Sequence, residues 1–93
     1  MKQSFSWSVD ASYKDNINNI EEVENPIISR EMRDLALNLQ GNSIFIKSAE
    51  MLTGGIYFEL ETSKTYIDCL TMYCVESINY LSGNLIVKIF IKL

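Results

Sequence analysis

The sequence predicts an α+β fold in which a single-layer antiparallel four-stranded sheet carries helices packed on one face. Two observations support this class. Four segments have apolar residues at every second position, the period of two that is typical of strands, and other segments repeat apolar residues every three or four positions. Read in chain order, these segments follow the β-α(α)-β-β-α-β arrangement called ferredoxin-like. With 93 residues, the chain is expected to form a single domain over residues 1–93.

The first strand is predicted over residues 5–11, where Phe5, Trp7 and Val9 alternate with serines. A short helix should follow this strand. From Tyr13 onward the apolar residues recur at steps of four and three, through Ile17 to Ile20, which is the spacing of one helical face.

A second helix is predicted to begin at Pro26 and to end before Gly41. Proline disfavours the helical conformation of the residue before it, so the first helix should end by Glu24 and Asn25 can cap the second. Apolar residues then recur at steps of four, three and four over residues 28–39. Gly41 stands where a left-handed residue terminates a helix.

Two further strands are predicted at residues 44–47 and 56–61, on either side of a turn formed by Gly54 and Gly55. The last strand is predicted over residues 85–92. It carries apolar residues on both faces, which predicts an interior position in the sheet.

Residues 65–82 allow two interpretations. The length of the segment and the position of Gly83 after it favour a helix. Against this, its aromatic, threonine and cysteine residues have indifferent helix propensity, and residues 65–75 as a strand would give an antiparallel meander. We prefer the helix.

The composition constrains where the protein acts and what it binds. Twelve acids against eight bases give a net charge of -4, which disfavours binding to nucleic acid or to an anionic membrane surface. The first residues do not resemble a signal peptide, and no run approaches the roughly 18 apolar residues of a spanning helix. We expect a cytoplasmic protein whose partner is a basic protein.

The residue types also limit the chemistry. The chain has no histidine, which is the commonest general base and metal ligand, and it has no glycine-rich phosphate-binding motif. Cys69 and Cys74 lack the second ligand pair of a zinc site, and we expect both to be free, buried and inert. We therefore predict no catalytic residue, metal or cofactor, and a protein that is not an enzyme.

Glu59 and Glu61 could form a carboxylate pair, because strand geometry places them on one face about 7 Å apart. We favour a structural interpretation, in which Lys47 and Lys88 on neighbouring strands form cross-strand charge pairs with them.

Two surfaces are candidates for binding a partner. The outer face of the sheet would carry an apolar patch that includes Tyr57 and Phe90, with a charged rim, as is typical of association surfaces. Glutamates are concentrated between residues 21 and 24, at the predicted C-terminal end of the first helix, where the helix dipole disfavours negative charge. The predicted partner-binding residues are Asp15, Glu21, Glu22, Glu24, Tyr57, Glu59, Glu61 and Phe90.

These features predict a non-enzymatic inhibitor of a basic protein, such as a toxin or a nuclease-like enzyme. Bacterial toxin-immunity proteins, which are antitoxin-like, are the class that this combination of small size and acidic charge suits best. The alternative is a small ligand-binding or regulatory homodimeric α+β module. The sequence is compatible with a monomer or a homodimer.

Overall fold

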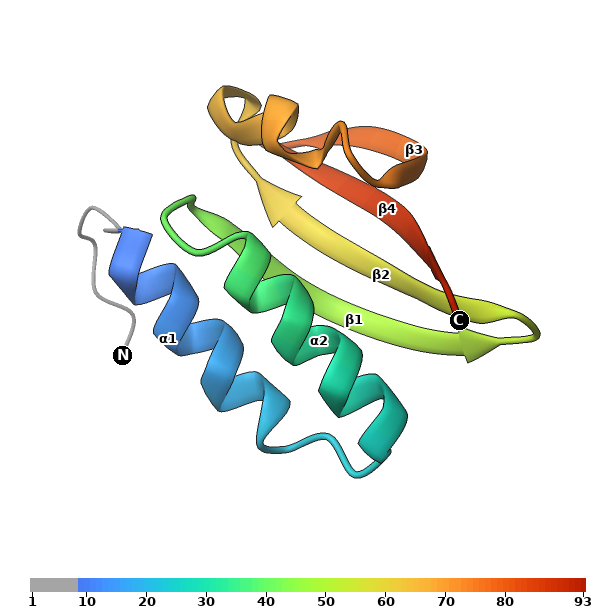
Figure 1. Cartoon of the computed structure of the whole chain (residues 1–93). Helices are drawn as coiled ribbons and strands as arrows, with labels where there is room; N and C mark the ends of the chain where they lie inside the picture. Colours follow the sequence, from blue (N-terminus) through green and yellow to red (C-terminus); the bar gives the residue numbers. More distant parts are fainter. Residues whose placement is uncertain (1–8) are drawn as a thin grey trace.

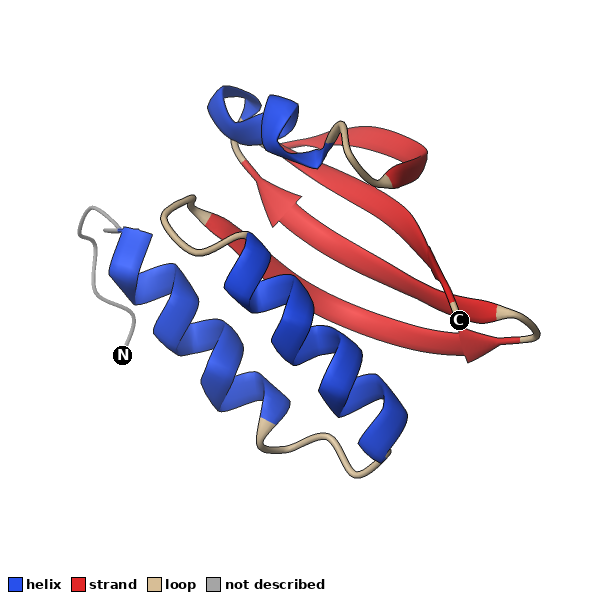
Figure 2. Cartoon of the chain, viewed as in Figure 1, coloured by secondary structure: helices blue, strands red, loops and turns tan. Residues whose placement is uncertain are grey.

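A computed structural model of the chain describes residues 9–93, in which two α-helices lie on one face of a four-stranded antiparallel sheet (Figures 1 and 2). The predicted α+β class and the single-layer sheet are confirmed. The strand order is β1-β2-β4-β3. The elements are α1 (Val9–Ile20), α2 (Pro26–Asn38), β1 (Ile44–Leu52), β2 (Gly55–Thr62), the 3₁₀ helix η1 (Lys64–Leu70), β3 (Cys74–Leu81) and β4 (Asn84–Lys92).

Helix α2 begins as the sequence predicts. Asn25 is extended, and its side-chain oxygen accepts hydrogen bonds from the backbone N–H groups of Ile27 and Ile28 at 2.9 and 3.2 Å. Pro26 lies in the first turn. Backbone N–H groups there have no acceptor within the helix, so the absence of an N–H in proline removes no hydrogen bond. Beyond the helix, Gly41 has a φ of 94°, the left-handed conformation expected after a helix end.

Helix α1 differs from the prediction at both ends. Val9–Ile20 is helical, so the last three residues of the predicted strand 5–11 belong to α1, and residues 5–8 lie outside the described part of the chain. The helix ends at Ile20, which leaves the glutamates after it in the connection to α2. Its most buried line is Ser12, Asn16 and Ile20, spaced by four, while Tyr13 and Ile17 are half-buried beside it. The apolar pattern missed this line because two of its members are polar.

The predicted helix over residues 65–82 is wrong. Lys64–Leu70 forms η1 and Cys74–Leu81 forms β3, so the alternative of a strand over residues 65–75 is also wrong. Ser82 and Gly83 both have positive φ, 48° and 87°, as the two central residues of a type I′ hairpin turn require. Gly83 therefore closes the β3–β4 hairpin instead of ending a helix. The described residues do not follow the ferredoxin-like order, because four strands are complete between residues 44 and 92.

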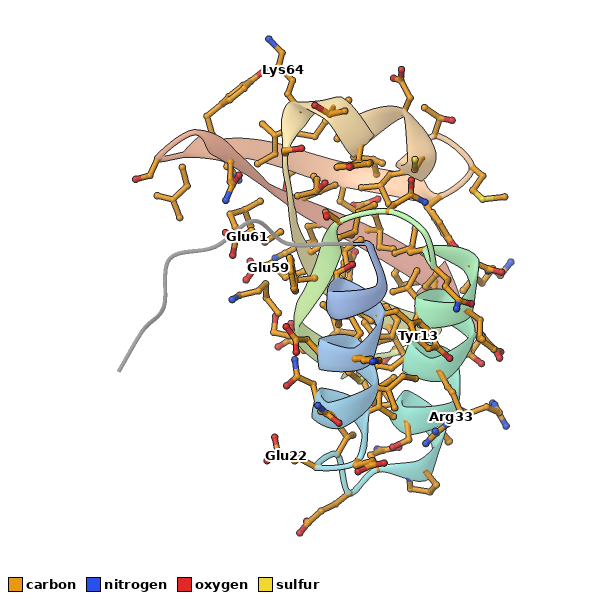
Figure 3. The ribbon with its side chains drawn as sticks, turned by 90° about the vertical axis from the view of Figure 1, so that its left-hand side faces the viewer. Tyr13, Glu22, Arg33, Glu59, Glu61 and Lys64 are labelled. Carbon is orange, nitrogen blue, oxygen red and sulfur yellow. The ribbon has the colours of Figure 1, made fainter. Side chains whose placement is uncertain are left out.

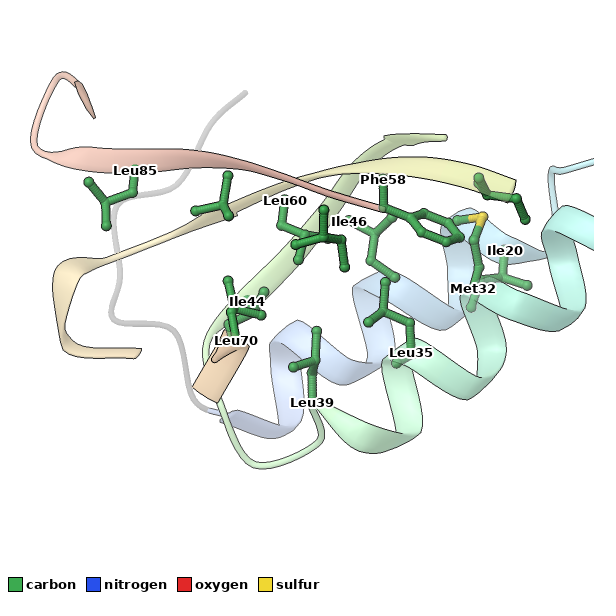
Figure 4. Close-up of a cluster of buried hydrophobic side chains, with 14 residues drawn as sticks. Ile20, Met32, Leu35, Leu39, Ile44, Ile46, Phe58, Leu60, Leu70 and Leu85 are labelled. Atoms are coloured by element: carbon green, nitrogen blue, oxygen red, sulfur yellow. The ribbon is translucent and has the colours of Figure 1, made fainter. Parts of the chain in front are cut away.

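The core lies between the sheet and the two helices (Figure 4). Along β2 the burial alternates, with Phe58 and Leu60 facing inward and Tyr57 and Glu59 half-exposed on the outer face. β4 lies between β2 and β3, which confirms the predicted interior position. Helices α1 and α2 contact β1, whereas every residue of β3 is exposed. The fully buried side chains include Ile20, Leu35, Ile44, Ile56, Phe58, Leu60, Leu70, Val87 and Ile89.

Candidate functional site

Aromatic and charged residues of β2 and β4 meet on the outer face of the sheet. The register places Tyr57 opposite Phe90, and their ring centroids are 4.9 Å apart with an interplanar angle of 49°. Lys88 lies in register with Glu59, and its Nζ is 5.9 Å from the centroid of the Tyr57 ring. Of the predicted patch, the two aromatic rings are in contact, and Lys88 lies beside one of them.

The Glu61 carboxylate is held in place by residues from both neighbouring strands. Its Oε1 lies 3.4 Å from Nζ of Lys47 on β1, and its Oε2 accepts a hydrogen bond from Nδ2 of Asn84 at 2.9 Å. The cross-strand charge pair predicted for Glu61 and Lys47 is present. An exposed ion pair of this kind adds little to stability, but the two contacts fix the direction of the carboxylate.

Lys47 lies at an irregularity of the β1 edge. The register between β1 and β2 shifts between Ile46 and Ser48, so Lys47 has no partner residue opposite it on β2. Three shallow, solvent-open hollows share Lys47 in their lining. Asp15 lines one hollow, Glu22 lines another and Glu61 lines the third. Three predicted site residues from distant parts of the sequence thus line hollows that open beside one lysine.

Two buried polar side chains place α1 beside this edge. Asn16 donates a hydrogen bond from Nδ2 to the carbonyl of Ile44 at 2.8 Å and accepts one from the N–H of Ile46 at 2.9 Å. One turn earlier, Ser12 donates to the carbonyl of Asn42 at 2.9 Å. Sequence reasoning missed both residues. The signal that could have found them is the spacing of four that they share with Ile20.

The amide of Asn16 pairs with β1 as a residue of an adjacent strand would, by bonding the carbonyl of one strand residue and the N–H two positions later. These bonds fix the orientation of the residues on either side of Asn16 in α1. Asp15, Asn18 and Asn19 consequently line the hollow beside Phe45 and Lys47.

The glutamates after α1 lie in the connection between the two helices. Glu21, Glu22 and Glu24 are all exposed in the connection between α1 and α2, not in the last turn of a helix as predicted. Only Glu22 lines the hollow beside Lys47 and Ser48. In Figure 3, Glu22, Glu59 and Glu61 lie on one side of α1, whereas Tyr13 and Arg33 lie on the other.

We define the acidic face as Asp15 and Glu22, which line hollows at Lys47 on the β1 edge, Glu59 and Glu61 on β2, and the lysines next to them, Lys47 on β1 and Lys88 on β4. It adjoins the aromatic pair Tyr57–Phe90. Glu50 was not predicted, although it stands in register with Tyr57 and is exposed at the border of this face. Of the eight predicted residues, Asp15, Glu22 and Glu61 line hollows that share Lys47, Tyr57, Glu59 and Phe90 lie on β2 and β4, and Glu21 and Glu24 line none of these hollows.

The two cysteines are free, as predicted, but they are not both buried: Cys69 is half-buried and Cys74 is exposed. Sγ of Cys74 lies 3.3 Å from Oε2 of Glu76. The hydrogen bond to this carboxylate, a small desolvation effect and the carboxylate's negative charge raise the pKa of the Cys74 thiol above its ordinary value. A raised pKa lowers the thiolate fraction at neutral pH and makes the thiol a poor nucleophile.

Within residues 9–93, no cluster of three or more histidine, cysteine, aspartate and glutamate residues has an arrangement that could hold a metal ion. None of the helices in that part of the chain has the length and apolar character needed to cross a membrane. Comparison with protein-family models, curated protein sequences and solved structures gave no match.

Proposed function

We propose that this protein is a non-enzymatic inhibitor that acts by binding a basic protein in the cytoplasm. In this proposal it resembles bacterial toxin-immunity proteins in character, and its target is a toxin or a nuclease-like enzyme. The observation that supports the proposal best is the acidic face. Its carboxylates from α1 and the following connection line hollows at Lys47, and those of β2 lie on the strand that carries the aromatic pair.

The two parts of this surface suit the two stages of capturing a cationic partner. Carboxylates that outnumber the lysines around them attract a positively charged enzyme at a distance and speed the encounter. Tyr57 and Phe90 offer apolar area for the close contact, and aromatic residues are enriched among those that dominate binding energy.

The rigidity of the surface also favours binding. Tyr57, Glu59 and Glu61 project from β2, which is paired on both sides, and Glu61 is further held by Lys47 and Asn84. Side chains that are already ordered lose less entropy when a partner binds.

The proposal is tested with tagged protein, its candidate basic partner from the adjacent gene, and the rate of association at low and high salt. The acidic-face variant carries Glu22→Lys and Glu59→Lys. A control variant with the same change in net charge carries Asp34→Lys and Asp68→Lys, two exposed residues of α2 and η1 that line none of the three hollows.

We expect the acidic-face variant to associate at least about tenfold more slowly than the control variant at low salt, and this difference to shrink as salt is added. Equal losses in both variants would mean that only net charge matters and would remove the acidic face from the proposal. Absence of stoichiometric binding to any basic partner would refute the inhibitor function.

A small ligand-binding or regulatory module is the second candidate. The hollow between the start of β1 and the end of β2 favours it, because Phe45 and Tyr66 line it together with Lys47, Glu61 and Asn84. A ligand that occupies this hollow would raise the melting temperature without a protein partner. Substitution of Tyr66 by alanine should abolish that rise.

A further inference from the structure

The two edge strands differ in whether their outward-facing backbone groups have hydrogen-bond partners among the described residues. On β1, the side chain of Asn16 bonds both the Ile44 carbonyl and the Ile46 N–H, so a helix covers the edge. On β3, the other edge, every residue is exposed, and no such bond to its outer edge is found among the described residues. Unpaired strand edges are templates for pairing with another strand.

The second half of β3 suits pairing. The register with β4 is irregular between Val75 and Ser77, where the charged Glu76 lies, but it is regular from Ser77 to Leu81. That regular segment has no charged residue and no proline, the residues that usually block edges. Large apolar side chains remain uncovered there: Ile78 is 45%, Tyr80 73% and Leu81 60% exposed.

We propose that a second copy of this chain pairs antiparallel with the Ser77–Leu81 segment, so that two sheets join into one of eight strands. In an arrangement with two-fold symmetry the same segment forms both sides of the contact, so the segment must complement itself. A neutral strand offers nothing to the charges of a basic partner, whereas it meets no like charge when it faces its own copy.

The register that fits places Asn79 on the two-fold axis. Ile78 and Tyr80 project from the same side of β3, since they are in register with the buried Val87 and Leu85 of β4. With Asn79 opposite its own copy, Ile78 faces Tyr80 of the second copy, and this contact occurs twice. Pairs of an aromatic and a β-branched residue are among the cross-strand pairs that stabilise sheets.

The remaining pairs of this register and the location of Glu76 are compatible with it. On the opposite face, Ser77 meets Leu81 of the second copy, and the two Asn79 amides lie side by side. Glu76 and the irregularity at Val75 fall beyond the paired segment, where they do not interrupt it. The apolar area that the contact removes from water is modest, so we expect a dimer of about micromolar to millimolar affinity.

The proposed dimer does not depend on the inhibitor function. β3 and β1 are opposite edges of the sheet, so pairing through β3 leaves both acidic faces free. A dimer without a basic partner would support this inference while the inhibitor proposal failed, and a monomer that captured a basic partner would do the reverse.

Cysteine cross-linking tests the register. In the full chain with Cys69→Ser and Cys74→Ser, the change Asn79→Cys puts two thiols opposite each other, with Cβ atoms about 5 Å apart and close to the spacing of a disulfide. The matched control, Ser77→Cys, is exposed on the same face but would lie about 13 Å from its copy.

Mild oxidation should convert most of the Asn79→Cys protein to a covalent dimer, at least tenfold faster than the Ser77→Cys protein. Sedimentation equilibrium of the unmodified chain should show a reversible dimer, and Tyr80→Lys should weaken it at least tenfold while circular dichroism confirms an intact fold. A chain that stays monomeric up to about 1 mM would overturn the proposal. So would equal cross-linking of both cysteine variants, or a dimer that Tyr80→Lys leaves unchanged.

Discussion

Replacing Asn16 by alanine should destabilise the fold far more than replacing a solvent-exposed polar residue of α1 would. Asn16 is 2% exposed, and its side chain satisfies one carbonyl and one N–H of β1. Alanine removes both partners while Ile44 and Ile46 remain buried. Each of the two buried backbone groups left without a partner costs about 1–3 kcal/mol, so the expected loss in the free energy of unfolding is about 2–6 kcal/mol.

That loss is large for a domain of this size, because 93 residues correspond to a total stability of about 5–14 kcal/mol. Urea unfolding followed by circular dichroism gives the loss directly. With a slope near 1.5 kcal/mol per molar urea, the midpoint should fall by roughly 1.3–4 M.

Asn18→Ala is the matched control for this measurement. Asn18 lies on the same helix, but it is exposed and makes none of these bonds to β1. Its removal should change stability by less than about 0.5 kcal/mol. Hydrogen exchange gives a second measurement, because the Ile46 amide should lose its protection selectively in Asn16→Ala. If Asn16→Ala matched Asn18→Ala in both measurements, the amide would not be serving as a partner for the β1 edge.

Three further predictions concern single residues. Gly55→Ala should lower the free energy of unfolding by about 1–3 kcal/mol, because the added Cβ would overlap the Ile91 carbonyl and the Phe90 ring. An unchanged melting curve would contradict this. Asn25→Ala should cost about 1 kcal/mol through loss of the α2 cap, and helicity measured by circular dichroism should fall slightly; no change would exclude the cap as a source of stability. Glu76→Gln should lower the pKa of the Cys74 thiol, so alkylation by iodoacetamide should accelerate at neutral pH and its pH profile should shift downward; an identical profile would refute the assigned cause.

Local backbone requirements explain which parts of the fold could be predicted from the sequence. Pro26 and Asn25 act on adjacent residues, so the start of α2 was predicted correctly. The apolar residues on both faces of residues 85–92 correctly placed that strand inside the sheet. By contrast, Gly83 has the same left-handed conformation after a helix and in a hairpin turn, so its presence alone could not distinguish β3 from a helix.

The candidate site was partly predictable for a similar reason. Strand alternation put Tyr57, Glu59 and Glu61 on one face, because every second residue of a strand shares a face, and the register with β4 places Phe90 opposite Tyr57. The position of Asp15 and Glu22 beside Lys47 depends on the docking of α1 against β1. That docking relies on two polar side chains, which hydrophobic periodicity does not register.

The hydrogen bonds from α1 to β1 also bear on how the chain avoids misassembly during synthesis. If α1 detaches, the carbonyl of Ile44 and the N–H of Ile46 become available to strands of other molecules. Translation produces α1 before β1, so the residue that covers this edge already exists when the edge first leaves the ribosome. No described residue covers β3 in this way, and it leaves the ribosome just before β4, the strand with which it pairs. Nascent chains should therefore be most open to wrong pairing in the interval between the synthesis of β3 and the closing of its hairpin.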